Sequence, residues 1–310
     1  MMSKDEHQSV LVKEVLEGLA IKPDGIYLDL TFGRGGHSAL ILQALGPKGR
    51  LLAVDKDPQA VEVARQLPFT DSRFAIHHAG FNDIGRIVEA HDEVGSVSGI
   101  LLDLGVSSPQ LDEASRGFSF MQEGPLDMRM NPTKGVSARE WLQEASANEI
   151  AEVLWRFGEE KSARRIAAAI VAHREQQPLQ TTTELSRLIE QVCPRRGSTK
   201  HPATKSFQAI RIFINKELEE LESCLSQCLE VLAVGGRMCV ISFHSLEDRI
   251  VKQFIREMEI GSLPARLPIR DEEVDRRLRS IGKPSRPSQE EILGNNRARS
   301  AIMRVAERIV

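Results

Sequence analysis

Short apolar runs alternate with longer segments of mixed polarity along the first hundred residues. Each apolar run ends in polar residues, and the segments between the runs are long enough for helices. This alternation is typical of a parallel sheet whose strands are joined by crossover helices. It predicts strands at residues 26–30, 50–54, 73–77 and 98–103, and helices at 38–46, 58–66 and 82–91.

The strand pattern stops after Asp103, and residues 110–207 contain helix starts instead. Three capping boxes occur there, in which Ser or Thr and a Glu three positions later satisfy the free amides at a helix start. We therefore expect a helical domain in this part of the chain. The three boxes are Ser137 with Glu140, Ser146 with Glu149, and Thr181 with Glu184.

The α/β pattern resumes near the end of the chain. Apolar positions at helical spacing predict one amphipathic helix from Ile210 to Leu232, which we expect to pack on the sheet. A Gly235-Gly236 turn then leads into a strand at 237–243, and a last strand is expected at 300–306.

Together these elements predict an α/β fold with a Rossmann-like, doubly wound sheet. Residues 1–108 and 208–310 would form this domain, and residues 109–207 would form an all-helical insertion. Ligands of such sheets bind beyond the carboxyl ends of the strands.

Composition is ordinary for a globular protein, with 41% hydrophobic residues among 310. No apolar run approaches the roughly 18 residues that a membrane span needs, and the polar N-terminus is not a signal peptide. We expect a cytoplasmic protein without a membrane partner. The four cysteines are scattered, and neither a metal site nor a disulfide is expected from their spacing.

Basic residues are unevenly distributed, although the net charge is −3. Residues 191–216 and 276–289 contain no acid and together carry +11, which leaves −14 elsewhere. Such windows are typical of surfaces that contact RNA phosphates, and a solvated loop is the alternative for either one alone.

A glycine-rich loop follows the first expected strand. Gly33, Gly35 and Gly36 allow the backbone to approach a ligand, and the amides of the next helix would face it. Asp55 ends the second strand about 20 residues later, where a carboxylate accepts hydrogen bonds from ribose hydroxyls. The loop therefore predicts a nucleotide-like ligand.

Two residues argue against a dinucleotide. Ser38 stands where the third glycine of G-x-G-x-x-G would fall, and Asp29 lies inside the first strand. The pattern D-x-x-x-G-x-G resembles motif I of class I S-adenosylmethionine (SAM) methyltransferases. A purely structural strand-to-helix turn is the alternative.

Two later strand ends extend the same edge of the sheet. Phe81 follows the third strand, where it would lie against an adenine ring or fill the core. Asp103 ends an apolar strand, and a carboxylate there is costly without a partner, which favours a functional role.

Seven segments, in order along the chain, resemble the bacterial small-subunit rRNA cytosine-N4 methyltransferase family. The resemblance implies a class I methyltransferase domain with a helical insertion, SAM as the methyl donor, and a decoding-centre cytosine of 16S rRNA in the small ribosomal subunit as the target. The segments are residues 7–14, 29–38, 101–112, 116–120, 201–212, 243–252 and 296–301.

The resemblance also implies a set of SAM contacts. His37 and Gln110 rest on the resemblance alone, whereas the others were already expected at the strand ends. The set is Gly35, Gly36, His37, Asp55, Phe81, Asp103 and Gln110.

Exocyclic-amine methyltransferases often accept the amine N–H with a group in an acid- or Ser-Pro-Pro-aromatic motif after the fourth strand. Here Asp103 or Ser108 fits that role, but the motif's aromatic residue is absent. Phe118 or Phe120 would stack on the target base or anchor the insertion. Further candidates for substrate binding are Arg195, Arg196, Lys200, Lys205 and His244.

Three other interpretations stay open. A hydrolase would use His244, Asp248 and a serine, but no G-x-S-x-G motif supports it. A methyltransferase acting on DNA or a small molecule, and an RNA-binding or division-related scaffold without turnover, are the others. Formation of a homodimer is left open.

Overall fold

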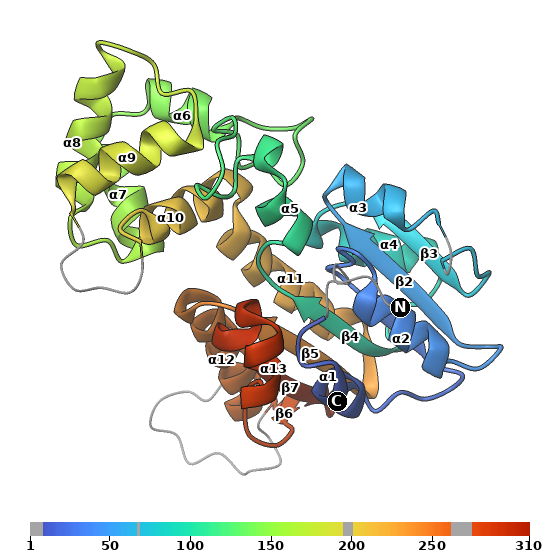
Figure 1. Cartoon of the computed structure of the whole chain (residues 1–310). Coiled ribbons are helices and arrows are strands. Elements are labelled where there is room, and N and C mark those ends of the chain that lie inside the picture. The colour runs from blue at the N-terminus through green and yellow to red at the C-terminus, as the bar shows by residue number, and fades with distance from the viewer. Residues whose placement is uncertain (1–8, 67–68, 195–200, 262–274) are drawn as a thin grey trace, which may run out of the picture. The chain divides into compact units, whose positions relative to one another are not determined.

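The computed structural model describes residues 9–66, 69–194, 201–261 and 275–310. The chain divides into two compact units (Figure 1). The sheet unit comprises residues 1–105 and 218–310, and the helical unit comprises residues 106–217. The second boundary lies between residues 217 and 218 rather than 207 and 208, because α10 (Thr204–Asn215) packs against α7 (Ala147–Gly158).

The sheet unit is built on a seven-stranded sheet with the order β3-β2-β1-β4-β5-β7-β6. The strands β1 to β5 are parallel, and β7 is antiparallel to both β5 and β6. Five of the six expected strands are confirmed within two residues at each end. The strand expected at 237–243 begins earlier, at Leu232, so the turn expected at Gly235-Gly236 is wrong: these two residues lie inside β5, where its register with β4 shifts. The short β6 was not expected. The strands are β1 (Ile26–Asp29), β2 (Arg50–Asp55), β3 (Phe74–His78), β4 (Val97–Asp103), β5 (Leu232–Ser242), β6 (Leu278–Ser280) and β7 (Ile302–Arg308).

Helices cover both faces of this sheet, which explains why its central strands are apolar without alternation. On β4, Ile100 and Leu102 belong to one core cluster with α4, α11 and α12, while Leu101 belongs to another with α1 and α2. The helices of this unit are α1 (Val12–Leu19), α2 (Gly36–Ala44), α3 (Pro58–Val63), α4 (Ile84–Ala90), α11 (Glu217–Val231), α12 (Ser245–Ile260) and α13 (Gln289–Gly294), with the short helices η1 (Phe81–Asp83) and η4 (Asn296–Ser300).

The single helix expected from Ile210 to Leu232 is wrong. The chain forms two helices, α10 and α11, which are separated at Lys216, and Leu232 already belongs to β5. Lys216 adopts a left-handed conformation with φ of 52°, and its amide bonds back to Ile212 and Phe213, which ends α10. Apolar spacing continued across this break, so periodicity alone did not reveal it.

The helical unit contains no strand of its own among the described residues, as expected. The three capping boxes are confirmed at the starts of α6, α7 and α9. In the described part of the whole chain, no helix is both long enough and apolar enough to cross a membrane. The helical elements of this unit are α5 (Ser108–Asp112), η2 (Ala114–Arg116), α6 (Ala138–Glu144), α7, α8 (Ala163–Arg174), α9 (Thr182–Val192) and α10.

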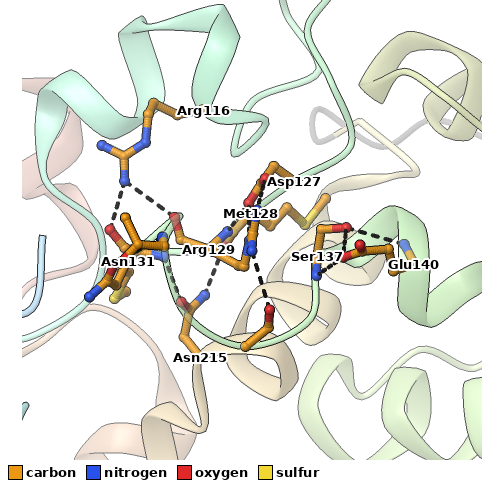
Figure 2. A network of polar contacts seen from close by, with 11 residues as sticks. Arg116, Asp127, Met128, Arg129, Asn131, Ser137, Glu140 and Asn215 are labelled. Carbon is orange, nitrogen blue, oxygen red and sulfur yellow. Dashed lines mark hydrogen bonds and ion pairs between the residues drawn. The ribbon is translucent and has the colours of Figure 1, made fainter.

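A buried loop at residues 126–131 ties the helical unit together (Figure 2). Met128 has a φ of 62°, which an unbranched side chain adopts only when its surroundings hold it there. The Asn215 side chain accepts from the Met130 amide at 2.7 Å and donates to the Met128 carbonyl at 2.7 Å. Arg116 donates to the Met130 carbonyl at 2.8 Å. These side chains therefore satisfy backbone groups that have no sheet or helix partner.

Asn215→Ala should destabilise the helical unit by about 2–3 kcal/mol, because it leaves buried backbone groups without partners. Both tryptophans of the chain, Trp141 and Trp155, lie in this unit, so urea unfolding followed by tryptophan fluorescence reports on it selectively. Asn148→Ala, at an exposed position of α7, is the matched control and should change stability by less than about 0.5 kcal/mol. Equal midpoints for the two variants would contradict the role given to Asn215.

Candidate active site at the strand ends

Three aspartates end three neighbouring strands. Asp29, Asp55 and Asp103 are the last residues of β1, β2 and β4, and in the register of the sheet Asp29 lies opposite Ala53 and Leu101. The strand order reverses between β1 and β4. Such a reversal opens a crevice at the carboxyl ends of the strands, which is where open α/β sheets bind ligands.

Asp29 connects β1 to α2. Its side chain is buried, and its carboxylate accepts from the Ser38 hydroxyl at 2.6 Å and from the Thr31 amide at 3.1 Å. Burial raises the pKa of Asp29, and the hydrogen bonds from Ser38 and Thr31 oppose that rise. Ser38 was interpreted from the sequence only as a missing glycine, but the structure makes it a hydrogen-bond donor that fixes the start of α2.

The glycine loop is shaped mainly by contacts within the chain. Gly33 and Gly35 have φ values of 57° and 75°, and the Gly33 amide donates to Asp55 at 2.8 Å. A Cβ on Gly35 would lie 2.3 Å from the Phe69 ring, and one on Gly36 would lie 2.0 Å from the Ser9 hydroxyl. Close packing and a left-handed backbone therefore require glycine at 35, whereas at 36 the Ser9 hydroxyl would have to move.

Asp55 and Phe81 lie on the β2 and β3 side of this edge. The Asp55 carboxylate also accepts from the Asp57 amide at 2.8 Å, and burial raises the pKa of Asp55 to about 6. Phe81 is half-buried at the start of η1, and the Lys56 ammonium lies 6.0 Å from its ring. Lys56 itself forms an ion pair with Glu220 at 2.5 Å.

Asp103 is the least satisfied of the three aspartates. Its amide donates to the Thr31 hydroxyl at 2.7 Å, so Thr31 connects the ends of β1 and β4. Its Oδ1 is buried and has no hydrogen-bond partner among the described residues, while 25% of the side chain stays exposed. Burial and the nearby negative charges of Asp29 and Glu247 raise the pKa of Asp103 to about 8.

His37 faces Asp103 from the first turn of α2. The two side chains approach to 3.7 Å between Nε2 and Oδ2, and the His37 Nε2 has no hydrogen-bond partner within the described residues. Burial lowers the pKa of His37 to about 4, which keeps the ring neutral at physiological pH. An unsatisfied imidazole nitrogen and an unsatisfied carboxyl oxygen therefore lie at one edge, where a polar ligand would satisfy both.

His244 caps the helix that follows β5. Its Nδ1 accepts from the Glu247 amide at 3.4 Å, and its Nε2 lies 3.1 Å from the buried Glu247 carboxylate. Asp248 is held instead by two bonds from Arg304, at 2.8 and 3.0 Å. Because Asp248 is paired with Arg304, the structure does not support the hydrolase interpretation.

Ser108 and Gln110 belong to α5 in the helical unit. Ser108 is half-buried in the first turn of that helix. The Gln110 side chain is buried and accepts from the Ser107 amide at 2.9 Å, which completes a capping box that was not expected from the sequence.

The two candidate aromatic residues differ in their surroundings. Phe118 is buried, and the Arg116 guanidinium lies 5.8 Å from its ring. Phe120 is half-buried, with the rings of His201 and Phe207 at 4.7 and 4.8 Å. Phe120 thus keeps an exposed part that Phe118 lacks.

The basic window at 191–216 is partly used within the protein. The Lys205 ammonium donates to the Glu159 carbonyl at 3.0 Å, and Arg211 binds Glu217 through two bonds of 2.8 Å. Three further candidates for substrate binding lie outside the described residues: Arg195, Arg196 and Lys200.

The mixed seven-stranded sheet, with helices on both faces and carboxylates at its strand ends, has the class I methyltransferase fold. The model of the MraW methylase family matches residues 4–309. The chain therefore belongs to the MraW methylase family.

A relative with high sequence identity agrees with this membership. The chain is 55% identical over 305 residues to "Ribosomal RNA small subunit methyltransferase H" of Coxiella burnetii strain RSA 493, covering 98% of this chain and 99% of the relative. A solved structure of a putative rRNA methylase from Clostridium thermocellum aligns at 10% identity, over 98% and 100% of the two chains, with a TM-score of 0.46. A putative methyltransferase from Streptococcus mutans, solved in complex with SAH, aligns at 10% identity over 98% and 100%, with a TM-score of 0.44.

Asp103→Asn should remove a pH dependence of stability. In the folded protein the pKa of Asp103 is about 8, which is above its value in the unfolded chain. Between these two pKa values the folded state keeps the Asp103 proton and the unfolded state loses it. The free energy of unfolding therefore falls as pH rises through this range. From pH 6.5 to 8, the wild type should lose roughly 1 kcal/mol per pH unit relative to the variant, and the difference should level off above pH 8. His37 and Asp55, with pKa values of about 4 and 6, titrate below this window.

Chemical denaturation of ligand-free wild type and Asp103→Asn at intervals from pH 6.5 to 9 measures this difference. A difference in unfolding free energy that does not change with pH would show that Asp103 is ionised in the folded protein throughout the range.

Proposed function

We propose that this protein transfers the methyl group of SAM to the exocyclic N4 amine of a cytosine in the decoding centre of 16S rRNA. The structural observation that supports SAM binding is the pair of unsatisfied polar atoms at the strand-end edge, Asp103 Oδ1 and His37 Nε2. The substrate would be the rRNA of the small ribosomal subunit, and the reaction would take place in the cytoplasm.

The residues present fit a cationic, nucleoside-containing ligand. Three carboxyl groups lie at or near the strand-end edge: Asp29, Asp103 and Glu247. The positive charge of a bound sulfonium would reduce the repulsion between them. Asp55 retains lone pairs for ribose hydroxyls beyond the two amides it binds, and Phe81 offers a ring face for adenine.

The relatives support the choice of substrate. The Coxiella burnetii proteins are named as methyltransferases of small-subunit ribosomal RNA and match almost the whole chain. The choice of cytosine N4 rests on the motifs that resemble the cytosine-N4 family, including residues 101–112 and 116–120.

The protein's part in this chemistry is mainly to orient the reactants. When bound, SAM supplies an electrophilic methyl group on its sulfonium. Asp29, Thr31 and Ser38 hold the glycine loop and the β4 end in fixed positions, so that the bound molecules need little reorganisation. Closing water out of the site favours methyl transfer to the amine.

The amine of cytosine must lose an N–H proton during the reaction. We assign Asp103 two roles, a contact to SAM and an acceptor for this N–H, and Ser108 is the alternative acceptor. Once SAM has displaced its proton, the Asp103 carboxylate can accept a hydrogen bond from the N–H of the cytosine amine.

The helical unit would recognise the RNA. Phe120 is the better candidate for stacking on the target base because Phe118 is buried. Arg195, Arg196, Lys200 and Lys205 would contact phosphates. Gln110 is proposed as a SAM contact and His244 as a substrate contact.

Small subunits from cells that lack this enzyme should gain N4-methylcytidine when they are treated with the protein and SAM. The measurement is mass spectrometry of nucleosides from treated and untreated 16S rRNA. Asp55→Ala should lose SAM binding and leave the rRNA unmodified, because it removes the expected ribose acceptor. Methylation of DNA or a small molecule, with no new N4-methylcytidine in rRNA, would refute the proposed substrate.

Binding of SAM near pH 7 should release a proton from Asp103, because a cation favours its charged form. Calorimetry in buffers of different ionisation enthalpy measures this release. SAM should release more protons than SAH, whose sulfur carries no charge. The release should be largely lost in Asp103→Asn. Equal proton release by wild type and variant would exclude Asp103 as the group facing the sulfonium.

A further inference from the structure

An open groove lies on the sheet unit, apart from the strand-end site. Its volume is about 400 Å³, and it is formed by the second half of α12, the chain after β6, and β7. Apolar side chains contribute to its lining, including the buried Ile255 and the exposed Ile260. Charged residues also line it: Lys252, Arg256, Glu259, Lys283 and Arg304.

Three of the four cations in this groove are not used within the protein. Lys252, Arg256 and Lys283 are exposed, and none has a carboxylate partner among the residues that the structure describes. Arg304, by contrast, is paired with Asp248, and the one acid, Glu259, accepts from the amide and hydroxyl of Ser280. The groove therefore presents a net positive charge.

Basic residues near the groove, unlike Lys252, Arg256 and Lys283, are paired with acids. Arg279 and Arg237 both bind Glu307, at 2.6 and 3.0 Å, and Arg277 binds Asp275 at 3.0 Å. Within the basic window at 276–289, Arg277 and Arg279 are paired with acids of this unit, whereas Lys283 lines the groove. Sequence alone gave all of them equal weight.

The arrangement suits a polyanion rather than a small anion. Lys252 and Arg256 are four residues apart on α12, so they lie on one face of the helix, and Lys283 approaches from another segment. Exposed cations without a cage of buried amides bind a phosphate chain through its charge and leave its sequence unread.

We propose that this groove binds the phosphate backbone of the rRNA substrate at a point flanking the target nucleotide. This inference rests on the proposed function. Lys252 to Ile260 lie eight to sixteen residues beyond His244, which is roughly 12–24 Å along the helix axis at 1.5 Å per residue. The groove therefore holds the RNA at a distance from the methyl-transfer site and positions it without taking part in the chemistry.

The test is the salt dependence of binding to naked 16S rRNA by the variant Lys252→Gln/Arg256→Gln/Lys283→Gln. The slope of log K against log salt is negative, and each lost phosphate contact should reduce its magnitude by about 0.7–0.9. The triple variant should therefore reduce the magnitude by about two units or more. The matched control is Lys22→Gln/Lys48→Gln/Arg86→Gln, which removes the same charges from exposed positions of the same unit and should keep the wild-type slope.

Methylation kinetics separate this groove from the strand-end site. The groove variant should show KM for the small subunit raised about tenfold or more, with kcat and SAM affinity unchanged. A slope and KM equal to those of the control variant would overturn the inference. Weaker binding to assembled subunits with unchanged binding to naked rRNA would also overturn it, because the groove would then contact a ribosomal protein.

The same experiments distinguish failure of the groove from failure of the proposed function. If the wild type methylates rRNA and the groove variant matches the control, only the groove assignment is wrong. If the wild type transfers no methyl group to rRNA, the proposed function is wrong.

Discussion

The strand-end site depends on the buried carboxylate of Asp29. A carboxyl group inside a sheet is costly unless hydrogen bonds compensate for the lost water. Ser38 and Thr31 supply those bonds, and in doing so they fix where α2 begins and how the loop leaves β1. Thr31 also accepts the Asp103 amide, so the neighbouring strand end is held by the same short segment. One buried carboxylate thus sets the geometry of the candidate active site.

That geometry produces the unusual electrostatics of Asp103. Asp29 and Glu247 are held nearby by their own hydrogen bonds, and Asp103 is left with a buried oxygen that has no partner within the described chain. Hydrogen bonds within the protein therefore satisfy Asp29 and Glu247, whereas Asp103 keeps an oxygen that a ligand could bind. These carboxyl groups lie where the strand order reverses, and His37 stays neutral beside them because burial lowers its pKa to about 4.

Much of the fold was predictable because local rules and the global fold agree. Both buried faces of β4 gave an apolar run, and the capping boxes at Ser137, Ser146 and Thr181 marked real helix starts. The break at Lys216 was missed because apolar spacing continued across two helices that serve different units. The three residues of β6 are too few for a periodic signal.

The sequence predicted those residues of the candidate site whose type and place at a strand end are informative by themselves. Asp55 and Asp103 were expected from their places at strand ends, whereas His37 rested on family resemblance because one histidine at a helix start carries no signal of its own. The bond from Ser38 to Asp29 and the pairing of arginines around Glu307 depend on tertiary geometry. For the same reason, Lys252 and Lys283 could not be distinguished from paired cations before the structure was available.

The central claim is that Asp103 is a poised acid that a cationic ligand converts to its charged form. Carbon-13 NMR of the aspartate carboxyl groups, with Asp103→Asn to assign the resonance, measures it directly. The account predicts a pKa near 8 in the ligand-free protein, which falls well below 7 when SAM is bound and falls less with SAH. An ordinary aspartate pKa near 4 without ligand, unchanged by SAM, would contradict it.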